Sequence, residues 1–299
     1  MMKRNRGLLA LIAVLVVLLV VYFGLQAWNK SKEEEEAAVV HVTDTAAEDI
    51  VSIRLDVGNG EMVFEKEEDT WVYLSDPDFP LAQSYPETMA DTVGNITAVR
   101  ELSDGDTMED YGLDEPTYTI EYTDADGNVT DVYFGNMTGE NYYVTVGDEG
   151  RVYTVASTAL DSLSYTLDDI AQLDTFPSIG SGNLVKEVIT RGGETTVYDS
   201  EDEEQEEDIA SVAGGLGAVS LSEVADYSVE NEDLAGFGLD EETRITVEAT
   251  YTEDDEEKVL TLYIGNEDGS GNRYVMMNDS RIVYLISDEI CGNILNESE

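Results

Sequence analysis

The stretch Tyr111-Gly112-Leu113-Asp114-Glu115 recurs later in the chain as Phe237-Gly238-Leu239-Asp240-Glu241. A second phrase recurs with it in the same order, because Val132-Tyr133-Phe134-Gly135-Asn136 returns as Leu262-Tyr263-Ile264-Gly265-Asn266. Both spacings are close to roughly 130 residues, and self-similarity at a fixed period is the sequence signature of a repeated fold. The sequence therefore predicts two copies of one domain.

A third repeated phrase supports the same period. Arg151-Val152-Tyr153 is echoed by Arg281-Ile282-Val283-Tyr284. The chain has 299 residues, of which 42% are hydrophobic, and this is enough for two domains with packed cores. We expect the first copy over residues 49–176 and the second over residues 177–299.

Each copy is predicted to be α+β, with an antiparallel sheet and one or two covering helices. Apolar residues alternate with polar ones from Val51 to Val57, which is the period of a half-buried strand. Short runs of this kind follow at even spacing with turn signals between them, as in a meander. The expected strands are 51–57, 61–67, 70–74, 117–123, 129–134, 142–146 and 151–155 in the first copy, and 184–191, 194–199, 243–252, 258–264, 273–277 and 282–286 in the second. Helices are expected from Pro86 onward and over 157–163, 167–173, 209–219 and 288–295.

The two copies differ where the second carries a mostly acidic run from Asp199 to Asp208. In the first copy the corresponding place holds the strand with Trp71, predicted over 70–74. So many like charges cannot sit side by side in a sheet. The sequence therefore predicts that the second copy has lost or shortened this strand.

The amino terminus predicts a membrane anchor over residues 1–29, followed by an acidic stalk over residues 30–48. Leu8 to Leu25 is an apolar run of 18 residues, and a helix extended to Trp28 is about 31 Å long, the thickness of a hydrocarbon core. A cleaved secretory signal is the alternative, but the run is longer than an ordinary signal and no small-residue cleavage site follows it.

Basic residues before the apolar run place the amino terminus in the cytoplasm. We therefore expect a single-pass protein of the cell membrane, held in the lipid bilayer through residues 8–28, with both copies outside the cell. The chain has 66 acidic residues against 15 Lys and Arg, a net charge of −51. Such a charge excludes nucleic acid as a partner and leaves cations or basic protein surfaces. Solubility alone is the alternative explanation.

The residue inventory argues against an enzyme. His41 and Cys291 are the only histidine and the only cysteine, so a Ser-His-Asp or Cys-His centre and a zinc site are excluded. Gly214-Gly215-Leu216-Gly217 lacks the lysine of a phosphate loop. We expect no catalytic residue, no cofactor and no metal site. A glycosidase-type pair of carboxylates stays open, because it needs only two acidic residues.

Three repeated or clustered patterns have both a structural and a binding interpretation. Asp124-Ala125-Asp126-Gly127-Asn128 resembles a calcium loop in part, but a hairpin turn explains it. In the repeated phrase, Gly112 and Gly238 are expected to make a turn, the following leucine to fill the core, and the aspartate to cap the turn. The repeated tyrosines, Tyr133 with Tyr263 and Tyr153 with Tyr284, are expected to pack on the sheet rather than to form a ligand platform.

The basic single-pass amino terminus, the hairpins, the Tyr/Phe-Gly-Leu-Asp phrase and the strand ending in Gly-Asn together resemble the bacterial domain-of-unknown-function family 4340 (DUF4340). Members of that family are typically membrane-anchored and are often encoded beside an ATP-binding-cassette (ABC) transporter of the gliding-motility type. The resemblance implies an accessory role at the cell surface and carries over no catalytic residues. The second copy departs from the pattern at its acidic run and at Glu242, where the first has Pro116.

We therefore expect a non-enzymatic, membrane-anchored extracytoplasmic accessory or binding protein, associated with subunits of an ABC transporter complex. The alternative from another class is a cell-wall glycan-binding or carboxylate-dependent carbohydrate-active protein. A surface spacer stiffened by calcium is a third possibility.

Overall fold

A computed structural model describes residues 40–103, 107–147 and 150–297 of the chain. The predicted anchor, residues 8–28, and the first part of the predicted stalk lie outside these ranges. Within the described ranges, no helix is long and apolar enough to cross a membrane. From Val40 onward the segment predicted as stalk is folded, because β1 (Val40–His41) pairs with β5 (Thr97–Ala98) and Thr43 is buried.

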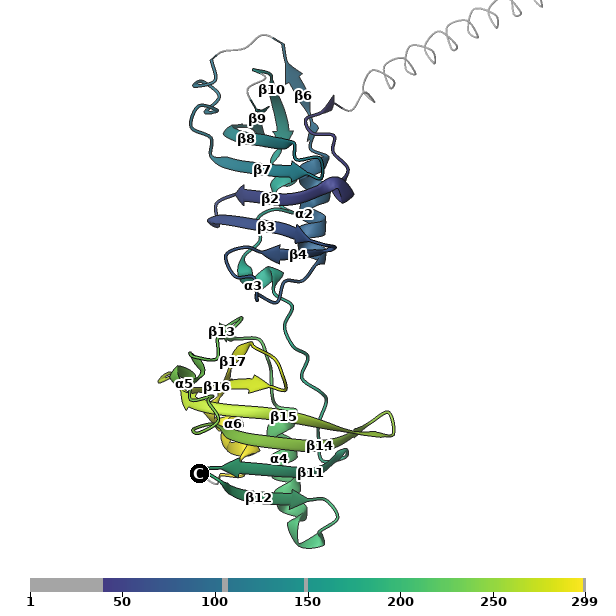
Figure 1. The fold of residues 1–299 in the computed structure, drawn as a ribbon, viewed down its shortest axis with the longest axis vertical. Coiled ribbons are helices and arrows are strands. Elements are labelled where there is room, and N and C mark those ends of the chain that lie inside the picture. Colours follow the sequence, from purple (N-terminus) through teal and green to yellow (C-terminus); the bar gives the residue numbers. More distant parts are fainter. Residues whose placement is uncertain (1–39, 104–106, 148–149, 298–299) are drawn as a thin grey trace, which may run out of the picture. The chain divides into compact units, whose positions relative to one another are not determined.

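The described chain is a mixed α+β structure with two large antiparallel sheets and a few helices (Figure 1). The first sheet has eight strands in the order β4-β3-β2-β7-β8-β9-β10-β6. Its strands are β2 (Ile50–Asp56), β3 (Glu61–Glu67), β4 (Thr70–Tyr73), β6 (Arg100–Leu102), β7 (Tyr118–Asp124), β8 (Val129–Thr138), β9 (Asn141–Val146) and β10 (Val152–Ala156).

The second sheet has seven strands in the order β12-β11-β14-β15-β16-β17-β13. Its strands are β11 (Leu184–Arg191), β12 (Glu194–Asp199), β13 (Val224–Asp226), β14 (Ile245–Glu253), β15 (Glu256–Glu267), β16 (Asn272–Met277) and β17 (Val283–Ser287). Taken along the chain, the two sheets share one strand order, except that β4 has no counterpart in the second sheet.

The register of the strands repeats as well as their order. In the first sheet the pairing of β2 with β7 shifts between Ile50 and Ser52, and in the second the pairing of β11 with β14 shifts between Leu184 and Lys186. A second irregularity follows Phe134 in β8 and Ile264 in β15. A β-bulge changes the direction of a strand at one defined residue. Because the bulges recur at corresponding residues, the strands of the two sheets can be aligned residue by residue.

The expected loss of a strand in the second copy is confirmed. Residues 200–223 are all described, and they contain no strand. The acidic run instead forms the turn η3 (Glu203–Gln205) and the first turn of α4 (Glu206–Gly217). Helix α4 begins earlier than the predicted 209, because Glu206, Glu207 and Asp208 are favourable at the positive end of the helix dipole.

The other helices are mostly shorter than expected. Helix α2 (Ser84–Gly94) begins two residues before the predicted Pro86. Ile96, which the apolar spacing predicted on the same helix face as Met89 and Val93, lies beyond its end. The predicted helix over 157–163 is a single 3-10 turn, and that over 167–173 ends three residues early. The remaining elements are η1 (Ala47–Asp49), η2 (Ser157–Leu160), α3 (Leu167–Ile170), α5 (Leu234–Phe237) and α6 (Asp288–Ile294).

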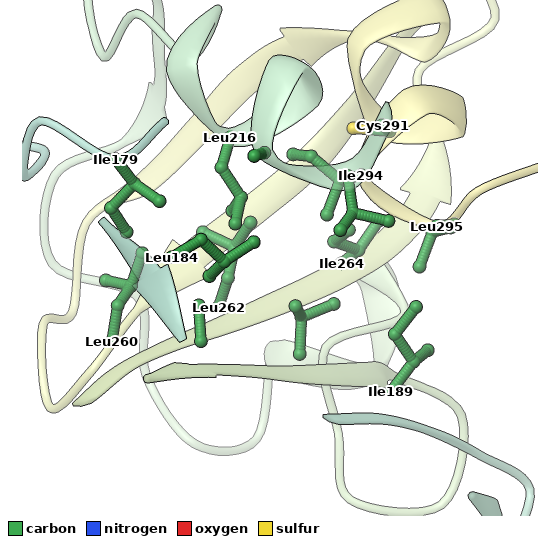
Figure 2. Close-up of a cluster of buried hydrophobic side chains, with 14 of the residues drawn as sticks. Ile179, Leu184, Ile189, Leu216, Leu260, Leu262, Ile264, Cys291, Ile294 and Leu295 are labelled. Atoms are coloured by element: carbon green, nitrogen blue, oxygen red, sulfur yellow. The ribbon is translucent and has the colours of Figure 1, made fainter. Parts of the chain in front are cut away.

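The core of the second sheet lies between its strands and the helices α4 and α6. Figure 2 shows Leu216 of α4 and Ile294 of α6 above Leu262 and Ile264 of β15. All four side chains are fully buried. In the first sheet the equivalent positions of β8, Val132 and Phe134, are also fully buried, so each copy has an apolar face of its own.

The described residues fall into two compact units, the first holding those up to residue 63 with those of 87–164, and the second holding 64–86 with those from 165 onward. This division passes through β3, so it does not by itself place the boundary between the copies. The predicted boundary between residues 176 and 177 stays a prediction.

Candidate functional site

The repeated Gly-Leu-Asp phrase ends a short helical turn in each copy. After α5, Gly238 takes a left-handed conformation with φ +67°. The Gly238 amide donates to the Ala235 carbonyl at 3.2 Å, and the Leu239 amide donates to the Leu234 carbonyl at 2.9 Å. These two bonds form a Schellman motif, which satisfies the last carbonyls of a helix and favours glycine.

The first copy repeats this geometry without a full helix. Gly112 has φ +68°, its amide donates to the Glu109 carbonyl at 3.0 Å, and the Leu113 amide donates to the Met108 carbonyl at 2.9 Å. The expectation that the glycine makes a turn is therefore confirmed in both copies.

The second repeated phrase lies directly against the first. A Cβ on Gly135 would come within 2.3 Å of the Tyr111 carbonyl oxygen, and one on Gly265 within 2.3 Å of the Phe237 carbonyl oxygen. The Asn136 amide also donates to the Tyr111 carbonyl at 2.7 Å. The two phrases recur together because the turn packs on the strand end with no room for a side chain.

The repeated leucines form small apolar clusters with Tyr133 and Tyr263 on the outer side of each sheet. Leu113 clusters with Val152 and Tyr133, and the equivalent Leu239 clusters with Val283 and Tyr263. Since Val132 and Phe134 point into the core, the alternation of strand β8 places Tyr133 on the opposite face. Packing on the sheet is confirmed for Leu113, Leu239, Tyr133 and Tyr263. The other repeated tyrosines, Tyr153 and Tyr284, are buried as well.

The aspartate of the phrase caps the turn in the second copy. The Asp240 carboxylate accepts from the Glu242 amide at 3.0 Å and from the Thr243 hydroxyl, and these bonds lower its pKa, the Thr243 hydroxyl contributing most. In the first copy Pro116 stands where the second has Glu242, and a proline has no N–H to donate. The cap of the second copy therefore cannot form in the same way at Asp114.

An open hollow of about 580 Å³ lies beside this capped turn in the second copy. Its lining mixes polar and apolar side chains and carries both charges, in contrast to the apolar core on the other face of the sheet. The lining residues are Val229, Asn231, Leu234, Asp240, Glu241, Arg244, Tyr263, Met276, Asn278, Asp279, Ser280 and Arg281.

Two arginines, Arg244 and Arg281, line the hollow. The Arg244 guanidinium lies 4.0 Å from the centre of the Tyr263 ring, and within the described residues it makes no ion pair. Arg281 donates to the Val229 carbonyl. By contrast, Arg273 pairs with two carboxylates and Arg54 with two others. Arg244 is therefore a cation held in place by an aromatic face, with its charge available.

Neither Arg244 nor the hollow was predicted from the sequence. Arg244 directly precedes β14, and the equivalent position in the first copy is Thr117, because Tyr118 and Ile245 hold the same place in the sheet. An alignment of the two copies could therefore have identified Arg244, as a basic residue that is present in only one copy.

A buried carboxyl is the second feature that the sequence did not predict. Glu187 in β11 is fully buried, and neither carboxyl oxygen has a hydrogen-bond partner within the described chain. Burial raises its pKa to about 8. Glu187 lies opposite Ala249, whereas the equivalent Ile53 lies opposite Tyr122. The smaller alanine across the strand gives the carboxyl its space.

The possible calcium loop is a hairpin turn. It connects β7 and β8, and the Asp124 carboxylate accepts from the amides of Asp126 at 3.0 Å and Asn128 at 2.8 Å. The Asn128 side-chain amide donates to the other oxygen at 2.8 Å. Nowhere in the described ranges do three or more His, Cys, Asp or Glu side chains form a group that could hold a metal.

The two reactive residue types lie apart from the hollow's lining. Cys291 is buried in the core of the second sheet, and burial raises the pKa of its thiol to about 12, which keeps it protonated and unreactive at neutral pH. His41 lies in β1, where its Nδ1 is 3.0 Å from the Asn95 side-chain oxygen.

Comparison with protein families gives a match. A family model described as Domain of unknown function (DUF4340) matches residues 71–211 and, separately, residues 203–291. The search of curated proteins and the search of solved structures each gave no match.

Proposed function

The chain belongs to the DUF4340 family, and on that premise we propose that it is a non-enzymatic binding protein associated with an ABC transporter complex. In this proposal residues 8–28 anchor it in the cell membrane, and both sheets lie outside the cell. Residues 1–7 face the cytoplasm. The second copy supplies the surface that meets the partner protein.

The repeated residues are accounted for by folding. Gly112, Gly135 and their partners in the second copy are explained by close packing between a turn and a strand end. Leu113 and Tyr133 are explained by an apolar cluster. The features that recur in the chain therefore have a folding reason, and the features that differ between the copies are candidates for function.

The single observation that carries the proposal is Arg244 on Tyr263. Arginine and tyrosine are enriched at the centres of protein interfaces, where they supply a large rigid surface and several donors. Here the guanidinium is oriented by the ring, it has no carboxylate partner among the described residues, and it lines a hollow wide enough to take side chains of another protein. Three carboxylates also line the hollow, those of Asp240, Glu241 and Asp279. They favour hydrogen-bond donors on the partner protein.

Cross-linking in native membranes tests this function. We expect transporter subunits to be recovered with the wild-type protein and to be strongly reduced with Arg244→Ala, whose loss at an interface centre is expected to weaken binding by about thirtyfold. Arg54→Ala is the matched control, since Arg54 lies on the first sheet and is paired with Glu61 and Glu121.

Two outcomes would contradict the proposal. Recovery of the wild-type protein without any transporter subunit would reject the association. Equal recovery with Arg244→Ala and Arg54→Ala, both folded by circular dichroism, would show that the hollow is not the contact surface.

A further inference from the structure

The open edge of the second sheet is the most informative feature outside the hollow. Strand β12 is the outermost strand there, beside β11, and Figure 1 shows it at the end of the sheet. In the first sheet the strand in the same place, β3, is covered by β4. The second copy therefore has a position for one more strand, which the described chain does not fill.

The first sheet closes its own edge in two ways. Strand β4 pairs with β3 from Phe64 to Glu67. The side chain of Gln83 then occupies the outer side of β4, accepting from the Trp71 amide at 2.7 Å and donating to the Trp71 carbonyl at 3.0 Å. Proteins commonly protect an edge in this way against pairing with another chain.

The edge of β12 is protected only at its end. The Asp199 amide donates to the Gln205 side chain at 2.9 Å, so this amide points away from β11. Because antiparallel residues alternate between the two sides, the backbone groups of Val197 and Thr195 point the same way. Strand β12 contains no proline, lysine or arginine, and its pairing with β11 is regular from Arg191 to Lys186.

Charge decides which strand fits this edge. The acidic run continues directly from β12, with Glu201 to Glu204 in the connecting segment and Glu206 to Asp208 at the start of α4. Any segment lying along β12 passes beside these carboxylates. An extended segment rich in lysine or arginine would gain hydrogen bonds from the edge and attraction from the run.

We propose that the open edge of β12 binds an extended, lysine- or arginine-rich segment of a partner protein as an additional strand. This inference rests on the proposed binding function and names the chemistry of the partner. The backbone N–H and C=O groups of Thr195 and Val197 supply the pairing, and the run from Asp199 to Asp208 selects for positive charge.

A second copy of this chain fits the edge poorly. Full antiparallel overlap of two β12 strands would set the acidic run of each copy beside Glu194 of the other. Like charges that face each other across strands are destabilising. The same charge that attracts a basic strand therefore keeps the edge from pairing with itself.

The test uses the full-length protein in detergent and a labelled synthetic peptide of about six residues that alternates lysine and valine. Fluorescence anisotropy measures its binding to Val197→Pro and to Val197→Thr. Proline at this position removes an amide that β11 does not use, so the sheet stays intact. Threonine keeps the amide and the branched shape, and is the matched control.

We expect the peptide to bind the wild type and Val197→Thr alike and to bind Val197→Pro about tenfold more weakly, the size of one or two lost hydrogen bonds. A peptide with glutamate in place of lysine is expected not to bind. Equal binding of the peptide to Val197→Pro and Val197→Thr would mean that charge attraction alone holds the peptide. That result would overturn the proposed strand pairing. A concentration-dependent dimer of the wild type that Val197→Pro abolishes would identify a second copy as the occupant and overturn it too.

The outcome separates this inference from the proposed function. If Arg244→Ala loses the transporter subunits while the peptide ignores Val197→Pro, the binding function stands and the edge has no role. If no subunit is recovered but the peptide discriminates between the two Val197 variants, the edge binds a basic strand of some other partner.

Discussion

At the residue scale, two glycines explain why two distant phrases are repeated together. Gly135 and Gly265 lie where a turn crosses the end of a strand, and a Cβ on either would reach a carbonyl oxygen at 2.3 Å. A repeated glycine therefore marks a close approach of two backbones. The sequence predicted the turn at Gly112 and Gly238. It did not predict the contact of this turn with Gly135 and Gly265, because the tertiary fold decides which backbone segments touch.

Gly135→Ala is expected to destabilise the protein by about 2 kcal/mol, within the range seen for overpacked sites. The added methyl group would push the Tyr111 carbonyl away from the strand. Unfolding in urea, followed by circular dichroism, measures the change. Gly214→Ala in α4 is the control, since nothing lies within 4 Å of its Cβ position, and alanine favours a helix. A Gly135→Ala protein as stable as the control would contradict the packing.

Glu187 is a residue-scale feature that only the structure reveals. In the sequence it is one of 66 acidic residues, and its burial depends on the size of Ala249 across the strand. The equivalent Ile53 indicates that the fold prefers an apolar side chain there. The carboxyl therefore lowers the stability of the second copy whenever it is ionised.

Glu187→Met is expected to make the protein more stable than the wild type at neutral and alkaline pH. Burial raises the pKa of Glu187 from 4.5 to about 8, so between these values the folded state binds a proton that the unfolded state has released. The free energy of unfolding of the wild type should therefore fall as pH rises from about 4.5 to about 8, by an amount on the order of 3–5 kcal/mol.

Urea unfolding across this pH range tests the expectation. In Glu187→Met the fall should be absent and the protein more stable at pH 8. Exposed Glu248 on neighbouring β14 is the control position, and Glu248→Met should keep the wild-type pH dependence. The same slope in both variants would place the titrating group elsewhere.

At the element scale, alternation predicted the long strands and missed the short ones. Strands β2, β7, β11 and β14 carry clear apolar alternation and were expected. Strands β5, β6 and β13 have two or three residues each, which is too short for a period to be seen. Their place is set by pairing with distant strands, as β6 pairs with β10.

Asp124 organises the turn between β7 and β8, and Asp124→Ala should lower the melting temperature. Hydrogen bonds from Asn128 lower the pKa of Asp124, so its stabilising effect should be present at neutral pH and be lost as pH falls through the acidic range. Differential scanning calorimetry at pH 7 and pH 3 measures both effects.

Asp126→Ala is the matched control for this turn, since Asp126 takes part through its backbone amide. Calcium is expected to leave the melting temperature of the wild type unchanged, because the Asp124 oxygens are occupied by the turn. A rise in melting temperature with calcium would restore the metal interpretation of the loop.

At the scale of the whole molecule, the account is one fold present twice, with the second copy changed at its edge and beside its capped turn. Repeated phrases predicted the doubling, and the acidic run predicted the lost strand, because charge density excludes a strand. The hollow with Arg244 was not predictable, since it depends on which residues meet across strands. The open side of β12 follows from the lost strand only once the strand order is known. The function associated with these surfaces remains our proposal.

Hydrogen exchange of two equivalent strands tests the central claim most directly. Strand β3 (Glu61–Glu67) lies between two neighbours, whereas β12 (Glu194–Asp199) has one. Mass spectrometry of the full-length protein should find faster exchange in peptides that cover β12, because the amides of Thr195 and Val197 are unpaired on the open side. Equal or stronger protection of β12 would mean that its edge is already covered, and would contradict the account.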